Sequence, residues 1–167
     1  MKVASSMTTK VEKSLVGIAG EYAVASELCR RGVYAQLTLG NRKKVDLLLD
    51  GEKEIARVEV KTKQGREWPG VKGIAPEDGL KFLVLVDLHG KGPDEKPEFY
   101  VICKDEWRPF LEQKLQDKLK SKAVKIDDQG VPHFSHGWIG TGIKTNEVSQ
   151  FKNGWDKIVR VVGPTKD

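Results

Sequence analysis

Two carboxylates and a lysine on neighbouring extended segments are the residues of this sequence best suited to chemistry. Residues 55–62 read IARVEVKT, so in a strand the valines point to one face while Glu59 and Lys61 point to the other. Asp46 follows the same alternation in the preceding apolar segment. If residues 51–54 form a four-residue loop, strand pairing places Asp46 opposite Glu59.

This arrangement predicts a metal site. Directly opposed carboxylates repel each other across a strand pair. A divalent cation between Asp46 and Glu59 would remove the repulsion, and oxygen ligands of this kind suit a hard ion such as Mg²⁺. Lys61 would then lie at the edge of the site, where it could orient a metal-bound water or help to deprotonate it.

A helix over residues 14–31 is expected to bring a third carboxylate, Glu21. Apolar and small residues recur there at helical spacings of three and four: Leu15, Ile18, Ala19, Tyr22, Ala25, Ser26 and Cys29. A charge close to such a face needs a partner, and the sheet-side metal site is the obvious one. Gly17 and Gly20 weaken a helix, so we expect them to allow close approach of another backbone.

The other elements complete a layered α/β or α+β fold. Extended apolar segments bounded by turn residues predict strands at 33–39, 45–49, 55–62, 80–88 and 98–103. Trp107, Phe110, Leu111, Leu115 and Leu119 predict an amphipathic helix over 106–122. A short helix is also expected at 146–151 or 155–160. The order α–β–β–β–β–β–α indicates helices that bracket one sheet.

Together these residues resemble a known superfamily. Asp46 followed by Glu59-Val60-Lys61, with the helix segment GEYAVASEL and the turn GNRKKVD, resembles the PD-(D/E)xK nucleases over roughly residues 15–105. The sequence is most similar to small single-domain members such as Holliday junction resolvases, restriction-like enzymes and homing endonucleases of this fold. It departs from the motif at Val45, where the family name has proline.

The resemblance implies a fold, a cofactor and a reaction. It implies a restriction endonuclease-like core over residues 1–125, with a central mixed sheet flanked by helices, and a C-terminal extension, 126–167, packed on the same domain. Mg²⁺, for which Mn²⁺ could substitute, would be held by Asp46, Glu59 and the Val60 carbonyl, with Glu21 assisting directly or through water. Lys61 would match the motif lysine, and metal ions beside an ammonium suit phosphodiester hydrolysis.

Polar and basic side chains near these residues are candidates for nucleic-acid contacts: Arg42, Lys43, Lys44, Lys63, Gln64, Arg66 and Trp68. The basic ones could equally form a solvated rim. A lysine stripe on the second helix, at Lys114, Lys118 and Lys122, could meet a phosphate backbone or serve solubility alone. Core packing is the simpler interpretation of Trp107 and Trp155.

The histidines and cysteines are expected to be structural. His133 and His136 are three residues apart, but no matching Cys or His pair lies near them in the sequence, which argues against zinc. Cys29 and Cys103 are too few for a disulfide framework. Their apolar neighbours predict small core residues in a reducing compartment.

Composition excludes some classes of protein. The 167 residues include 29 Lys and Arg against 24 Asp and Glu, a formal charge of +5. Residues 51–100, which carry most of the proposed site, hold 9 basic and 10 acidic groups, unlike a uniformly basic binder. No apolar run approaches the roughly 18 to 20 residues that span a bilayer, and the first residues lack a signal-like apolar stretch, so a cytoplasmic location is expected.

The sequence therefore predicts a Mg²⁺-dependent endonuclease that hydrolyses DNA. A homodimer is expected from the habit of the family, because two sites could then address two strands. One alternative is the same fold retained as a nucleic-acid- or protein-binding module without catalysis. Another is a nuclease directed at RNA.

Overall fold

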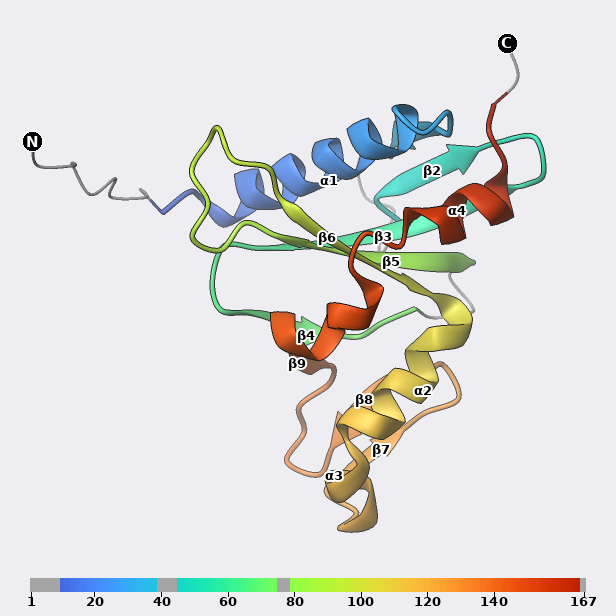
Figure 1. Ribbon diagram of the computed structural model, residues 1–167. Helices are drawn as coiled ribbons and strands as arrows, with labels where there is room; N and C mark the ends of the chain where they lie inside the picture. The colour runs from blue at the N-terminus through green and yellow to red at the C-terminus, as the bar shows by residue number, and fades with distance from the viewer. Residues whose placement is uncertain (1–9, 39–44, 75–78, 166–167) are drawn as a thin grey trace, which may run out of the picture.

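Five strands form one mixed sheet at the centre of the molecule (Figure 1). The computed structural model describes residues 10–38, 45–74 and 79–165. The strands are β1 (Tyr34–Leu37), β2 (Leu47–Asp50), β3 (Ile55–Lys63), β5 (Leu80–Asp87) and β6 (Glu98–Cys103), in the order β1-β2-β3-β5-β6. Only the central β3–β5 pair of this sheet is parallel. The predicted fold class, a mixed sheet flanked by helices, is confirmed.

Helices cover both faces of the sheet. Helices α1 (Lys13–Cys29) and α4 (Trp155–Val162) lie on one face, and α2 (Lys104–Lys114) lies on the other with the β4–β9 ribbon (Figure 1). The ribbon pairs β4 (Glu67–Val71) with β9 (Thr141–Lys144). The remaining elements are α3 (Gln116–Lys120), β7 (Val124–Ile126), β8 (Pro132–Phe134) and the 3₁₀ helix η2 (Thr145–Phe151).

Two apolar clusters fill the space on the two sides of the sheet. Side chains of β3 and β5 alternate between them: Val58 and Val84 join the cluster under α1 and α4, whereas Leu83 and Leu85 join the one under α2. Strand β5 is buried along its whole length except for one half-buried lysine, as expected for a central strand with both faces covered. The described part of the chain contains no helix long and apolar enough to cross a membrane.

The expected second helix is two helices. The chain leaves helical geometry at Leu115 (φ −105°, ψ 11°), which separates α2 from α3. Both short helices expected near the C-terminus are present, as η2 and α4. The strands β4, β7, β8 and β9, each three to five residues long, were not predicted.

The predicted buried face of α1 is wrong. The helix buries Val16, Gly20, Val24, Ala25 and Leu28. Of the predicted set only Ala25 is buried, whereas Leu15, Ile18, Tyr22 and Cys29 are exposed. Both sides of α1 are apolar, so the 3.6-residue period could not distinguish them.

A close contact at Gly20 determines which side faces the sheet. A Cβ built on Gly20 would lie 1.7 Å from the Thr62 Oγ1 of β3, far inside van der Waals contact. The predicted close approach is therefore confirmed at Gly20. At Gly17 it is wrong, since a Cβ there meets nothing within 4 Å. The Thr62 hydroxyl is buried under the helix without a hydrogen-bond partner among the described residues.

The two glycines form a matched pair for a stability experiment. We expect Gly20→Ala to lower the free energy of unfolding by about 1–3 kcal/mol, because the new methyl group forces α1 away from Thr62. Gly17→Ala should raise it by about 0.5–1 kcal/mol, because alanine favours the helix and the site is open. Urea denaturation followed by circular dichroism measures both. Equal effects of the same sign would contradict the close contact.

Candidate active site

The register between β2 and β3 is the one predicted from the sequence. Leu47 lies opposite Val58 and Leu49 lies opposite Ala56. Asp46 immediately precedes β2, and its backbone N–H donates to the Val58 carbonyl (3.0 Å). The hairpin therefore delivers Asp46 to the stretch of β3 that contains Glu59.

The Asp46 carboxylate lies against the edge of β3. Its Oδ2 accepts a hydrogen bond of 2.6 Å from the backbone N–H of Val60. In an extended strand the N–H and C=O of one residue point to the same edge, so the Val60 carbonyl faces the same side as this carboxylate. The Asp46 carboxylate and the Val60 carbonyl therefore lie on the same edge of β3, next to the first residue of β2.

The chain changes sides at Asp46. Val45 was expected to share an apolar face with Leu47 and Leu49, but it belongs to the cluster under α2 while the leucines belong to the cluster under α1. The alternation of a regular strand is broken there, because Asp46 lies outside the β2 ladder. This break allows the Asp46 side chain to lie along the edge of the sheet.

Glu59 and Lys61 point to the same face of β3, as predicted, and form an ion pair. Glu59 is only 4% exposed, and its Oε1 lies 2.6 Å from Lys61 Nζ. The lysine side chain is 44% exposed. A buried carboxylate needs a partner, which Lys61 supplies from the solvent side. The repulsion expected between Asp46 and Glu59 is offset by this ammonium and by the Val60 N–H.

Glu21 reaches the electrostatic environment of the same residues from α1. Burial raises the pKa of Glu21 above its usual value, the negative charge of Asp46 raises it further, and Lys61 opposes the shift. The carboxylate of α1 and the two charged side chains of the hairpin therefore influence one another. The raised pKa of Glu21 therefore reflects its burial first and the negative charge of Asp46 second.

The donor set of this region fits a hard cation. It offers carboxylates of Asp46, Glu59 and Glu21 and the Val60 carbonyl, all oxygen ligands of the kind that Mg²⁺ prefers. A divalent ion would also relieve the condition that raises the pKa of Glu21. Within residues 10–38, 45–74 and 79–165, however, no three His, Cys, Asp or Glu side chains lie close enough together to hold a metal. The residues fit in chemistry, and binding would require their side chains to converge further.

Two of the predicted nucleic-acid contacts are wrong. Trp68 is 1% exposed and its indole N–H donates to the Val86 carbonyl (3.0 Å), so it is a core residue. Lys63 is buried as well, with its Nζ 2.9 Å from Asp87 Oδ2 and 4.5 Å from the centre of the Trp68 ring. Neither side chain is available to a ligand.

The other predicted contacts differ in their surroundings. Arg66 is exposed. The Gln64 side chain accepts from the Val11 N–H (3.1 Å) and donates to the Val11 carbonyl (2.6 Å), which ties it to the start of α1. Residues 42–44, with Arg42, Lys43 and Lys44, lie outside the described part of the chain.

The sequence analysis missed a buried polar group around Asp87. Its Oδ1 accepts from the His89 N–H (2.8 Å), and its Oδ2 accepts from Thr145 Oγ1 (2.7 Å) as well as from Lys63. Burial alone would raise the pKa of Asp87, but these hydrogen bonds outweigh it and lower the pKa. One feature of the sequence could have predicted this cluster. Glu59, Lys61 and Lys63 share one face of β3, and a buried Lys63 needs an acidic partner on the neighbouring strand β5.

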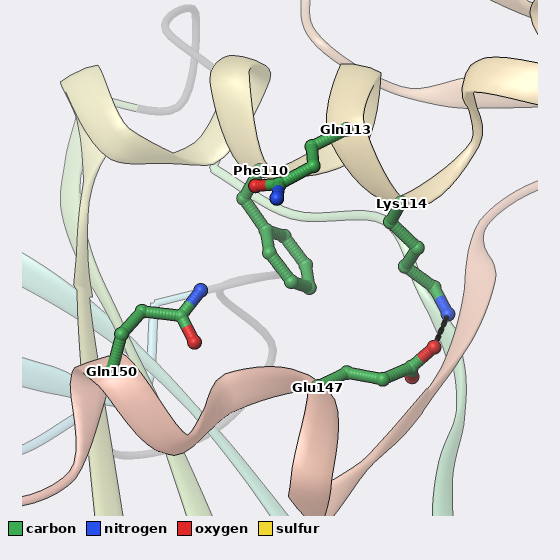
Figure 2. A pocket seen from close by; sticks show the side chains of 5 residues that line it. All are labelled: Phe110, Gln113, Lys114, Glu147 and Gln150. Carbon is green, nitrogen blue, oxygen red and sulfur yellow. Dashed lines mark hydrogen bonds and ion pairs between the residues drawn. The ribbon is translucent and has the colours of Figure 1, made fainter.

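A separate hollow lies between α2 and η2. It has a volume of about 230 Å³ and is lined by Phe110, Gln113, Lys114, Glu147 and Gln150 (Figure 2). Lys114 and Glu147 close one side with an ion pair of 2.6 Å. Because Glu147 holds its ammonium, Lys114 is not available for the phosphate contacts that the lysine stripe was predicted to make. None of the lining residues belongs to the candidate active site.

Two histidines and two tryptophans make contacts within the protein away from the candidate site. His133 Nε2 lies 2.8 Å from Asp127 Oδ2, and His136 stacks on Phe134. Trp107 and Trp155 are buried, which confirms their predicted core role. Of the two cysteines, Cys103 is half-buried, but the prediction of a core position for Cys29 is wrong.

Part of the chain is similar in structure to a bacterial homing endonuclease, I-Ssp6803I. The TM-score is 0.44 and the sequence identity is 19%, over 57% of this chain and 71% of that chain. No protein-family model and no curated protein matches the chain. A similarity of this size describes part of the fold and assigns no role to any residue.

Removing one partner of the buried Lys63–Asp87 pair should be costly. We expect Lys63→Met to lower the free energy of unfolding by about 3–5 kcal/mol, because it leaves Asp87 buried without its cation. The double variant Lys63→Met/Asp87→Leu should recover part of this loss. Lys81→Met is the control, since Lys81 and Glu54 form a half-exposed pair of similar length (2.6 Å) whose loss should cost less than about 1 kcal/mol. Equal losses for the two lysines would contradict the assignment.

The raised pKa of Glu21 predicts how stability changes with pH. Since folding favours the protonated form of Glu21, its contribution is greatest below the usual pKa near 4.5 and is lost as pH rises through the folded-state pKa. Without divalent ions, Glu21→Gln should therefore be more stable than wild type at pH 7, by roughly a few tenths of a kcal/mol.

The gain of Glu21→Gln should disappear below about pH 4.5 in denaturant unfolding at several pH values. The control is Glu27→Gln on the same helix. Glu27 pairs with Arg30 and Arg31, so its neutralisation should lower stability at pH 7. A loss of stability for Glu21→Gln at pH 7 would contradict the electrostatic picture.

Proposed function

We propose that the chain is a divalent-metal-dependent endonuclease of the PD-(D/E)xK kind that hydrolyses DNA phosphodiester bonds. The observation that carries this proposal is the Asp46 carboxylate held on the edge of β3 by the Val60 N–H, next in the strand to the Glu59–Lys61 ion pair and within the electrostatic reach of Glu21 of α1. Asp46, Glu59 and the Val60 carbonyl would hold Mg²⁺ or Mn²⁺, with Glu21 assisting directly or through water.

Hydrolysis of a phosphodiester needs a nucleophilic water and positive charge beside the phosphate. A bound divalent ion supplies an activated water near neutral pH and stabilises the charge that develops on phosphate oxygens. The chain supplies orientation. Asp46 is held by the Val60 N–H and Glu59 by burial on a central strand, so each carboxylate starts from a defined position and would have to converge on the ion when it binds.

Lys61 is suited to act on the attacking water or on the phosphate. Its Nζ holds Glu59 Oε1 in the structure, and its half-exposed side chain can rotate toward a ligand in solvent. An ammonium at this position donates a hydrogen bond to the water or to a phosphate oxygen and adds positive charge where negative charge develops. The raised pKa of Glu21 lets it hold a proton more readily than an ordinary surface glutamate.

Contacts with the DNA backbone are proposed for one exposed arginine and for the basic residues that precede Asp46 in the sequence. Arg66 is exposed in the loop between β3 and β4, and Arg42, Lys43 and Lys44 precede Asp46 in the chain. Guanidinium and ammonium groups suit phosphate oxygens without reading sequence. A location in the cytoplasm is part of the same proposal.

A second candidate function is a binding module without catalysis. The observation that favours it is the absence of a three-carboxyl cluster among the described residues, together with the Lys61 ammonium that holds Glu59. Such a module would keep the charged edge for contacts with nucleic acid or protein and would bind no metal there.

Cleavage assays separate the two functions. Plasmid, branched and single-stranded DNA, with a matched RNA, are incubated with the protein and Mg²⁺. We expect cleavage of DNA, and Asp46→Asn, Glu59→Gln and Lys61→Ala should each lower the rate at least about 100-fold, because each removes a ligand or a charge at the reacting phosphate. Glu54→Gln and Lys81→Ala are the controls, since they break an ion pair of the same length elsewhere on the sheet.

Metal binding provides an independent readout. Calorimetry with Mg²⁺ or Mn²⁺ should detect binding to the wild type that Asp46→Asn abolishes and Glu54→Gln preserves. Folded variants that all retain wild-type cleavage would overturn the assignment. A folded wild type that neither binds metal at this edge nor cleaves any substrate would favour the binding module, and preferential cleavage of RNA would change the substrate.

A further inference from the structure

The turn between β8 and β9 carries an exposed tryptophan. Residues 135–139 are all exposed, and Trp138 among them is 53% exposed. Of the four tryptophans, all within the described residues, the other three are only 1–3% exposed. The turn adjoins the lobe of α3, β7 and β8, on the opposite side of the sheet from α1 (Figure 1). A tryptophan that buries only half of its ring is a candidate for contact with a partner, and its surroundings indicate which partner.

The backbone holds Trp138 in a defined position. The Phe134 N–H donates to the Trp138 carbonyl (2.8 Å), and the Gly137 N–H donates to the Phe134 carbonyl (2.9 Å), which closes a tight hairpin. A Cβ built on Gly140 would lie 2.8 Å from the Gly70 backbone, and one built on Gly70 would lie 3.8 Å from Cζ2 of Trp138. The indole therefore lies next to β4 on one edge, and little order is lost when a ligand stacks on its exposed part.

Two more rings and an ammonium lie beside the indole. Phe134 is paired with Trp138 across the hairpin, and residues opposite each other point to the same side. His136 stacks on the Phe134 ring, with centroids 5.5 Å apart and an interplanar angle of 26°. Lys118 of α3 places its Nζ 5.1 Å from the centre of the same ring. Aromatic rings beside cations are the combination that binds the bases and phosphates of a nucleic-acid strand.

The end of α3 places a lysine where glycine is favoured. The Lys122 N–H donates to the Leu119 carbonyl (3.1 Å), and the next N–H, of Ala123, donates to the Lys118 carbonyl (2.9 Å). In this closing turn Lys122 has a φ of +59°, a left-handed conformation that disfavours a side chain. Since a lysine lowers stability at this position, its charge needs an explanation outside the fold.

The end of α1 shows the favourable alternative. It closes with the same pattern of two hydrogen bonds (3.0 and 3.1 Å), but Gly32 holds the left-handed position there (φ +79°). Lys122 also lies beside the tryptophan hairpin, because the carbonyl of its neighbour Ala123 accepts from the Ser135 N–H (2.9 Å). Residues 118–125 contain four lysines and no acidic residue, so positive charge gathers at this end of α3.

We propose that this aromatic tip binds single-stranded DNA. An unpaired base stacks on the exposed indole, and the lysines hold neighbouring phosphates. The tip consists of Lys118, Lys122, Phe134, His136 and Trp138, and none of these residues belongs to the candidate active site. An intact duplex buries its base faces, so it cannot use the indole in this way. The choice of DNA as the strand rests on the proposed function.

Binding of a labelled oligo(dT) of about 15 nucleotides tests the tip without catalysis. Fluorescence anisotropy is measured in EDTA, so that no strand is cleaved. We expect Trp138→Leu to weaken oligo(dT) binding at least about fivefold and to change duplex binding less than about twofold, because only an unpaired base can stack. Trp138→Phe should retain most of the affinity, since it keeps a planar ring. Tyr34→Leu is the control, because Tyr34 on β1 is also 53% exposed.

The indole itself reports stacking. Because the other three tryptophans are buried, oligo(dT) should quench the emission of Trp138 alone. The quenching should disappear in Trp138→Phe while binding persists in the anisotropy measurement. Circular dichroism and urea unfolding check that each variant folds.

Lys122→Gly separates charge from stability. It should raise the midpoint of urea unfolding, because glycine suits the left-handed turn, and yet weaken oligo(dT) binding about threefold. The slope of log affinity against log salt should become shallower by about 0.7, since one phosphate contact is lost. Lys96→Ala is the control, because Lys96 is exposed in the loop between β5 and β6, outside the tip.

The proposal is wrong if wild type and Trp138→Leu bind oligo(dT) equally, if Tyr34→Leu weakens binding as much, or if quenching persists in Trp138→Phe. An unchanged salt slope in Lys122→Gly would refute the phosphate contact, and tighter binding of oligo(rU) than of oligo(dT) would overturn the choice of DNA. These results are separate from cleavage. A chain that cleaves nothing can still bind a single strand at this tip, and an active nuclease can lack the contact.

Discussion

The alternation of side chains along β3 is the constraint on which the rest of the structure depends. Its even-numbered residues, such as Val58 and Val60, are committed to the apolar cluster under α1 and α4. The odd-numbered residues Glu59, Lys61 and Lys63 must then face the opposite cluster. A strand with neighbours on both edges cannot shift its register by one residue without burying three charges among the apolar side chains of α1.

The charged face of β3 is made compatible with the core by pairing each member. Lys61 offsets Glu59 at one end, and Asp87 of the parallel strand β5 offsets Lys63 at the other. The two pairs differ in exposure. Lys63 is closed in by Trp68 and by carbonyls of the following loop, whereas Lys61 reaches solvent. One pair therefore fixes the fold, while the other leaves an ammonium at the surface beside two carboxylates.

Local periodicity was enough to predict the five strands of the central sheet and the part of the candidate site that lies on one hairpin. The strand limits at residues 55 and 98 and the pairing of β2 with β3 follow from alternation and loop length alone. These features depend on residues close in sequence. The strand pairing that brings Asp46 to the Glu59 segment is one of these local features.

Contacts between distant segments could not be predicted in this way. Both sides of α1 are apolar, and the choice between them depends on Thr62, more than 40 residues away from Gly20. Lys63 looks like a surface lysine until the parallel register opposes it to Asp87. Trp68 looked like a loop residue because its strand, β4, pairs with β9 more than 70 residues later. The side change at Val45 likewise depends on the cluster under α2.

The contact between Gly20 and Thr62 also links the outer surface of α1 to the geometry of the candidate active site. Since Gly20 has no side chain, the backbone of α1 lies directly on the Thr62 side chain of β3, and only this one short side chain separates the helix from the strand. The next residue along the helix is Glu21. A force applied to the outer side of α1 would therefore be transmitted directly to the distance between Glu21 and the Asp46 hairpin, which makes this helix a rigid mechanical connection between the surface of the molecule and its charged edge.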